Sequence, residues 1–298
     1  MSGRAWVAFA GVAFLWGIPY LFIKLAVDDG VSPAFLSWSR IVLAAALLLA
    51  LAWRAGKLGG LRGRWRWIAL FALIEIALPF PLIATGEQHI TSSLTAILIA
   101  AVPLFVALLA LRFDHDERVG GMRLVGLLVG LAGVVALVGI DVAGRSEELL
   151  GALAVLVAAL GYAAGPMILK SRLAAVDTRA TMGASLAVAA ALLTPAALVT
   201  WPSETPSGDA LMSIVVLGLF CTAAAFVLWG FLVANAGPAR ASLITYVAPL
   251  VAVALGVVVL DESVGIGAAV GLVLILAGSW LATGGRVGRV QLRHGTGV

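Results

Sequence analysis

The chain has 298 residues, of which 62% are hydrophobic and only 11% are charged. An average soluble domain is about half apolar and roughly a quarter charged, so this composition excludes an ordinary soluble protein. The net charge of +4 comes from basic residues scattered through short loops, unlike the basic stripe of a nucleic-acid-binding protein. One cysteine, Cys221, and three histidines offer no intrachain disulfide, redox or metal site. We therefore expect an all-α integral membrane protein.

Ten apolar segments are each close to the roughly 20 residues that a helix needs to cross a bilayer. The first segment continues through Trp16 and Tyr20 to Val27, so we interpret it as a retained helix rather than a cleaved secretory signal. The expected spans are roughly 5–26, 33–53, 66–86, 92–111, 120–140, 148–169, 180–200, 210–234, 240–260 and 264–284.

The lysines and arginines of the loops are sorted by side. Sixteen of the 19 lie on the side of the N-terminus, while Lys24 and Arg145 lie on the opposite side and Arg40 lies inside a span. The opposite loops are acidic and include Glu87 and Asp261. Because cytoplasmic loops carry the excess of basic residues, this sorting predicts that both termini are cytoplasmic. It also favours an even number of spans. We expect the protein to lie in the plasma (inner) membrane.

The second half of the sequence resembles the first. GLLVGLAGVVALV (126–138) resembles GLVLILAGSWLAT (271–283), and DERVG (116–120) matches DESVG (261–265). We therefore expect two five-helix repeats, 1–141 and 142–285, followed by a basic cytoplasmic tail, 286–298. Because five is an odd number, the second repeat is inserted upside down. Inverted repeats of this kind are typical of transporters that work by alternating access around a site at the membrane midplane.

These motifs, together with FLWG (14–17), SRIVLAAALLL (39–49) and TSSLTAILIAAVPLFVALLAL (91–111), resemble the EamA-type members of the drug/metabolite transporter superfamily. The resemblance extends over nearly the whole chain. It implies a ten-helix secondary carrier that exports amino acids or other small metabolites without hydrolysing ATP. It also assigns Glu117 and Glu262 to the position before the last helix of each half. We expect these two acids to act structurally, near the N-termini of those helices.

Other functions remain open at this stage. Efflux of drugs or cationic compounds is an alternative within transport, and a structural or signalling membrane protein is an alternative outside it. An intramembrane enzyme would need paired acids, a histidine cluster or a Ser/His arrangement at depth, and the sequence has none of these. We expect no enzyme activity, cofactor or nucleic-acid partner. The expected partners are a small-molecule substrate, the lipid bilayer and protons as a candidate coupling ion.

Arg40 and Glu75 are the only charges well inside the expected spans. A charge at the bilayer centre costs about 2.5–3.5 kcal/mol on insertion scales, so both should face the helix bundle. Three roles remain for Glu75: an ion pair with Arg40, a proton-carrying group, or a ligand for a substrate amine. The repeat counterparts are Leu186 and Cys221, and this joint loss of both charges favours the pair.

Aromatic residues deep in the spans are candidates for lining a substrate cavity, the alternative being that they fill the bundle core. With Glu75, the candidate residues are Trp16, Tyr20, Tyr162, Phe226, Trp229 and Tyr246. Prolines within the spans predict bends, because each removes a backbone donor; they are Pro19, Pro79, Pro81, Pro103, Pro166 and Pro249. Glycines of the last helix of each half predict close helix packing; they are Gly126, Gly130, Gly133, Gly267, Gly271 and Gly278.

Overall fold

The computed structural model describes residues 1–113, 121–142 and 144–283, and Glu117 and the basic tail 286–298 lie outside these ranges. Every regular element in the described ranges is a helix. Helices suit an apolar chain because all of their backbone hydrogen bonds are made within the segment. The elements are α1 Gly3–Gly17, α2 Pro19–Asp28, α3 Pro33–Arg54, η1 Leu58–Leu61, α4 Trp65–Ala72, η2 Leu73–Ala77, α5 Pro79–Glu87, α6 Ser92–Ile99, α7 Val102–Phe113, α8 Met122–Leu137, η3 Val138–Val142, α9 Ser146–Ile168, η4 Leu169–Leu173, α10 Thr178–Val199, α11 Gly208–Val215, η5 Val216–Ala224, α12 Ala225–Ala236, α13 Pro238–Ala241, α14 Ile244–Val259 and α15 Ile266–Ala282.

All ten predicted segments are helical, and eight of them are long and apolar enough to cross a membrane. These eight are Gly3–Asp28, Pro33–Arg54, Trp65–Glu87, Ser92–Ala110, Met122–Val142, Ser146–Leu173, Thr178–Val199 and Gly208–Ala236. The last two apolar helices, α14 and α15, are shorter than expected, with 16 and 17 residues. For α14 the difference lies mainly at its start, where a turn at residues 242–243 precedes Ile244. Asp261, which has a positive φ of 52°, lies in the non-helical chain between α14 and α15.

Three of the predicted proline positions interrupt their helices. Pro19 begins α2, Pro79 begins α5, and Pro103 lies in the first turn of α7 after a break that follows α6. Proline is favoured at such positions because its missing N–H would have no partner in the first turn. By contrast, Pro166 and Pro249 lie inside the continuous helices α9 and α14.

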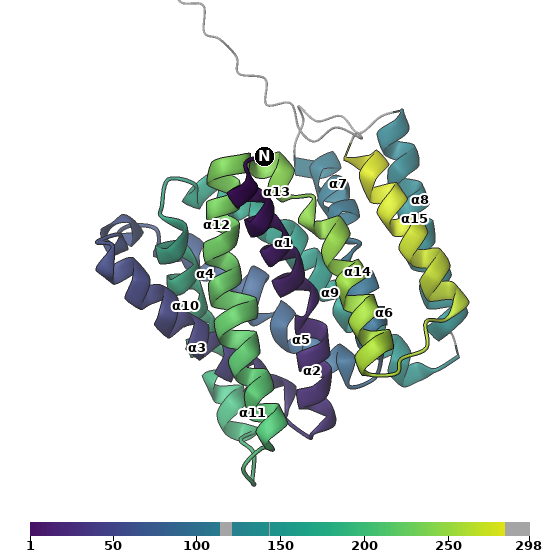
Figure 1. The fold of residues 1–298 in the computed structure, drawn as a ribbon, viewed down its shortest axis with the longest axis horizontal. Helices are drawn as coiled ribbons and strands as arrows, with labels where there is room; N and C mark the ends of the chain where they lie inside the picture. Colours follow the sequence, from purple (N-terminus) through teal and green to yellow (C-terminus); the bar gives the residue numbers. More distant parts are fainter. Residues whose placement is uncertain (114–120, 143, 284–298) are drawn as a thin grey trace, which may run out of the picture.

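The glycines of α8 and α15 pack these two helices closely together, as predicted. A Cβ atom on Gly126 would overlap the backbone of Ala282, and one on Gly278 would overlap the backbone of Gly130. Gly133 lies in the same way against the carbonyl oxygen of Gly271. Figure 1 shows α8 and α15 side by side at one edge of the molecule, with α3, α4 and α10 toward the opposite edge. Small residues allow this approach where lipid supplies no hydrophobic drive between helices.

Two acids join the halves of the chain by capping helices. Glu262, which follows α14, accepts hydrogen bonds from the backbone N–H groups of Ser92 (2.7 Å) and Ser93 (2.9 Å) at the start of α6. Asp141 accepts from the backbone N–H groups of Gly267 (3.1 Å) and Ala268 (2.5 Å) at the start of α15. The expectation that Glu262 serves the N-terminus of its own last helix was therefore wrong. Asp141 takes that place, and Glu262 caps a helix of the other half.

Candidate functional site

Glu75 lies in a π-helical stretch, η2, between α4 and α5. The N–H of Leu78 donates to the carbonyl oxygen of Leu73 (3.0 Å), five residues back, and the next residue, Pro79, has no N–H to give. The corresponding part of the eighth span, η5, is also π-helical and contains Cys221 and Thr222. Such π-helical insertions often mark functional sites.

The chain around Glu75 packs against two glycines of α9. Its carboxylate lies against Gly165, and the carbonyl oxygen of Ile74 lies against Gly161, so that neither glycine has room for a Cβ atom. The Oε2 atom of Glu75 is buried and has no hydrogen-bond partner among the described residues. The sequence analysis overlooked this contact, although Gly161 and Gly165 form a G-x-x-x-G pattern that is typical of close helix packing.

Arg40 is buried in the middle of α3, with 6% of its surface exposed. Its Nη2 donates to the hydroxyl oxygen of Thr222 (3.2 Å) in η5, and Thr222 in turn donates to the carbonyl oxygen of Leu217 (2.8 Å). The guanidinium carbon lies 4.3 Å from the ring centroid of Phe80 in α5. The Nε of Arg40 is buried without a partner among the described residues. Arg40 is thus held by one hydroxyl and one ring, with donor capacity left over.

The favoured ion pair between Arg40 and Glu75 is not made in this structure. Within the described residues, the ion pairs within 4.0 Å are Lys24–Asp28, Arg145–Glu148 and Arg179–Asp177. The reason is the direction of each side chain, because Arg40 turns toward η5 and α5 whereas Glu75 turns toward α9. A basic and an acidic group therefore lie in the bundle without direct contact between them.

A further buried acid, Glu87, lies at the end of α5. The sequence pattern placed it in a wet outer loop, but its side chain is fully buried and neither carboxylate oxygen has a partner among the described residues. Lys24 of α2 donates to the backbone oxygen of Glu87 (2.9 Å) and pairs with Asp28 (2.9 Å). No sequence signal identified Glu87, because it stands next to the exposed Gln88 at a helix end.

Two of the three predicted tyrosines, Tyr20 and Tyr162, lie near these ionisable groups. Tyr20 lies within electrostatic range of Arg40 and Glu87, and Tyr162 lies within range of Arg40, Glu75 and Tyr20. Tyr162 also packs against two of the apolar cores, one built on α3, α4 and α10 and the other on α2, α5 and α11. The phenol groups of α2 and α9 therefore lie among the ionisable groups of α3, η2 and α5.

Three of the predicted aromatic residues form a second cluster. Trp16 packs edge-on against Phe226, with ring centroids 6.0 Å apart, and lies 6.2 Å from Trp229. These contacts join α1 to α12. Tyr246 lies elsewhere, where its hydroxyl is 3.3 Å from that of Thr283 just beyond α15. That these candidate residues line a substrate cavity stays a prediction.

Comparisons with known proteins agree with this architecture. The EamA-like transporter family model matches the chain twice, at residues 3–139 and 149–284. The chain is 31% identical, over 281 residues, to a probable terminal-alkyne amino-acid exporter of Streptantibioticus cattleyicolor, covering 92% of this chain and 91% of that protein. It is 29% identical over 247 residues to the inner membrane transporter YedA of Escherichia coli, covering 81% and 78%. YoaV, a transporter of Bacillus subtilis, is 25% identical over 276 residues, covering 91% and 94%.

One solved crystal structure shares the fold, with a TM-score of 0.66, 24% sequence identity and coverage of 95% of this chain and 98% of that one. The double match of the family model accounts for the internal resemblance between the two halves of the sequence. The chain therefore belongs to the EamA-like transporter family.

Proposed function

We propose that this protein is a secondary active transporter of the inner or plasma membrane that exports small zwitterionic metabolites, with amino acids as the principal class. The observation that carries the proposal is that Arg40 and Glu75, a basic and an acidic group, do not touch and that each keeps a buried polar atom without a partner among the described residues. A carboxylate on the substrate would accept the free N–H donors of Arg40, and an ammonium group would donate to Glu75. Hydrogen bonds in which the donor or the acceptor is charged are roughly twice as strong as those between neutral groups.

The surroundings of the two charges support a substrate with an apolar side chain. Tyr20 and Tyr162 lie within range of the charged groups, and the Trp16–Phe226–Trp229 cluster offers apolar ring surface. One relative is named a probable terminal-alkyne amino-acid exporter, which is a substrate of this zwitterionic class. These features support amino acids over purely anionic or purely neutral metabolites.

Alternating access is the mechanism that we assign to this fold. Ten spans arranged as two inverted repeats, 1–141 and 142–285, would let the halves exchange conformations around a central site. The cap that Glu262 makes on Ser92 and Ser93 links the halves at one end of the bundle. Release of this cap would be one step in opening that end. Protons are the proposed coupling ion, since Glu75 is a buried carboxyl group that a proton and a substrate ammonium group could occupy in turn.

The purified protein in liposomes tests this function directly. Vesicles preloaded with an unlabelled amino acid should accumulate the same labelled amino acid by exchange, without ATP, when the protein is present and not in empty vesicles. A panel of amino acids and organic cations assigns the class of substrate. Exchange of amino acids supports the proposal. A panel in which no compound exchanges would contradict it.

Efflux of cationic compounds is the second candidate function. It is favoured by the aromatic cluster together with the carboxylate of Glu75, because cations bind the faces of aromatic rings. Arg40 weighs against it, since a buried guanidinium repels a purely cationic substrate. The same panel separates the two functions, because a cation carrier would exchange the organic cations and not the amino acids.

Orientation is tested separately by labelling single cysteines. We place both termini in the cytoplasm, so Gly60 should face the cytoplasm and Ser203 the opposite side. Both positions are exposed in the structure. In a Cys221→Ser background, a membrane-impermeant thiol reagent applied to intact cells should label cysteine at position 203 and not at position 60. The reverse pattern would invert the topology.

A further inference from the structure

A basic cavity of about 410 Å³ lies at the ends of two neighbouring spans, away from the central charges. It is lined by Arg62, Gly63, Arg64, Trp67, Ser171 and Arg172. The first three residues belong to the turn between η1 and α4, Trp67 belongs to the first turn of α4, and the last two belong to η4. The cavity is thus built from both halves of the chain.

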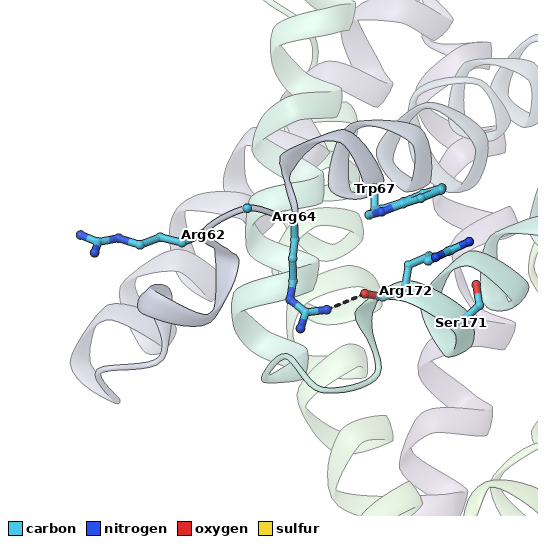
Figure 2. A pocket seen from close by; sticks show the side chains of 6 residues that line it. Arg62, Arg64, Trp67, Ser171 and Arg172 are labelled. Atoms are coloured by element: carbon cyan, nitrogen blue, oxygen red, sulfur yellow. Dashed lines mark hydrogen bonds between the residues drawn. The ribbon is translucent and has the colours of Figure 1, made fainter.

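The walls of this basic cavity are held in place by two contacts. Arg64 Nη1 donates to the backbone carbonyl oxygen of Arg172 (2.7 Å), and the guanidinium carbon of Arg172 lies 4.5 Å from the ring centroid of Trp67. Figure 2 shows Arg64 reaching across to η4 while the Arg172 side chain lies alongside the Trp67 ring; Arg62 points away from both. The hydroxyl of Ser171 donates to the carbonyl oxygen of Met167 (2.7 Å), so it is already engaged.

The charge of the basic cavity is not balanced by acids. None of its arginines has a carboxylate within 4.0 Å in the part of the chain that the structure describes. Arg66 adds a further positive charge, 5.1 Å from the same Trp67 ring. The basic cavity therefore gathers positive side chains that would favour an anion over a cation or a neutral group. The planar fork of arginine is matched to the oxygens of a phosphate group.

The position of the cavity points to a phosphate group that belongs to a lipid. One candidate span begins at Trp65 and another ends at Leu173, so the basic cavity lies where membrane helices reach the headgroup layer. Trp65, which is 53% exposed, is an aromatic residue of the kind that anchors at this depth. Trp65 also lines an apolar groove of about 440 Å³, together with Leu49, Leu61 and Ala187 among others. The charged headgroup of a lipid would lie in the basic cavity, and its acyl chain would find an apolar surface in this groove.

We infer that this basic cavity binds the phosphate headgroup of an anionic phospholipid, with Arg64 and Arg172 as its ligands and Trp67 as the support that fixes Arg172. The site joins the ends of α4 and η4. These elements continue into η2 and α9, which carry Glu75 and Gly165. A bound lipid therefore clamps together, at one membrane surface, the two segments that meet at the central acid.

Retention of lipid by the purified full-length protein tests this site. In an uncharged detergent, native mass spectrometry should show phosphatidylglycerol retained in preference to phosphatidylcholine, and phosphatidylglycerol should raise the thermal midpoint. Arg172→Gln and Arg64→Gln should each weaken retention about fivefold, the contribution of one basic residue at a membrane surface. Arg54→Gln removes an exposed arginine at the end of α3 and is the matched control.

Each outcome bears on the inference. Equal retention of phosphatidylcholine and phosphatidylglycerol by the unmodified protein would overturn it, whatever the variants do. Undiminished retention of phosphatidylglycerol in both Arg172→Gln and Arg64→Gln would overturn it as well. Stabilisation by millimolar inorganic phosphate as large as that by the lipid would show a soluble phosphate site instead. Selective retention that is lost with Arg172 and kept with Arg54 supports the lipid site.

Discussion

The carboxylate of Glu75 lies directly against Gly165, so that the π-helical stretch of one half of the chain is fitted onto a glycine face of the other half. Two features of the sequence produce this contact. Pro79 cannot donate a backbone hydrogen bond, and the chain before it adopts the wider π-helical turn. Gly161 and Gly165, one helical turn apart on α9, leave the space into which that turn protrudes.

A methyl group at position 165 should therefore be poorly tolerated. In Gly165→Ala the new Cβ would overlap the Glu75 carboxylate, and overpacking of this kind costs about 1–3 kcal/mol. We expect a lower thermal midpoint of the detergent-solubilised protein and a lower folded yield. Adding Glu75→Ala to Gly165→Ala should restore part of the stability, because the overlapping carboxylate is gone.

The matched control is Gly139→Ala. Gly139 is also a helical glycine, but a Cβ there would have no atom within 4 Å among the described residues. Its replacement should leave the thermal midpoint unchanged or slightly higher, since alanine favours a helix over glycine by about 1 kcal/mol. Equal effects of the two alanine substitutions would refute the tight fit at Gly165.

Glu262 should stabilise the start of α6, a helix of the other half of the chain. Its carboxylate accepts from the N–H groups of Ser92 and Ser93 and from the Ser93 hydroxyl. Hydrogen bonds to a charged group contribute about 1.5–3 kcal/mol, so Glu262→Ala should lower the thermal midpoint measurably. Glu147→Ala, which removes an exposed acid, serves as the comparison. A Glu262→Ala protein with normal stability and greatly weakened substrate binding would move this residue to the substrate site.

Arg40 and Glu75 should act independently on folded yield, because they do not touch. Breaking a buried ion pair from one side costs about 3–5 kcal/mol in soluble proteins, and a double change then restores part of the loss. Here we expect no such rescue. The double variant Arg40→Leu/Glu75→Cys, which copies Leu186 and Cys221 of the second half, should yield no more folded protein than the weaker single variant. Clear recovery of folded yield in the double variant would contradict this prediction, because it would mean that Arg40 and Glu75 form an ion pair in the folded protein.

The stability of the protein should depend on pH through Asp177, which caps the start of α10. Hydrogen bonds from the Arg179 side chain hold the pKa of Asp177 below its ordinary value of about 3.9. Its folded pKa is lower than its unfolded pKa, so its stabilisation is fully present above the unfolded value and is lost as pH falls through the folded one. Asp177→Ala should cost about 0.5–2 kcal/mol at neutral pH as a lost helix cap. The difference from the unmodified protein should shrink in thermal melts below about pH 4, whereas Glu204→Ala should show no difference at either pH.

Composition and hydropathy were enough to predict the helices and the membrane class. The glycine spacing in 126–133 and 267–278 also predicted that these helices pack closely, because a missing Cβ has a local consequence, but it did not show that they pack against each other. The start of α14 was harder to place, since a turn at residues 242–243 leaves no mark in the hydropathy of the segment.

Side-chain direction was the main feature that the sequence left undetermined. Arg40 and Glu75 were expected to pair because both are isolated charges, but a π-helical turn rotates Glu75 toward α9. Glu87 stands one residue from an exposed loop, and only the packing around α5 shows that it is buried. Glu262 was assigned to the helix that follows it, because a sequence does not show which N-terminus from the other half will be nearest.

The central claim is that Arg40 and Glu75 bind the two charged ends of an amino acid. The most direct test compares exchange, by the reconstituted protein, of an amino acid, of the analogue that lacks its carboxylate and of the analogue that lacks its amine. The account predicts that the zwitterion exchanges, while the analogue lacking the carboxylate and the analogue lacking the amine do not. Glu75→Gln and Arg40→Leu should each slow exchange of the zwitterion about 10-fold or more, as expected for losing one charge-assisted hydrogen bond, while Glu147→Gln should not. Exchange of the amine analogue at the same rate as the amino acid, unaffected by Arg40→Leu, would contradict the account.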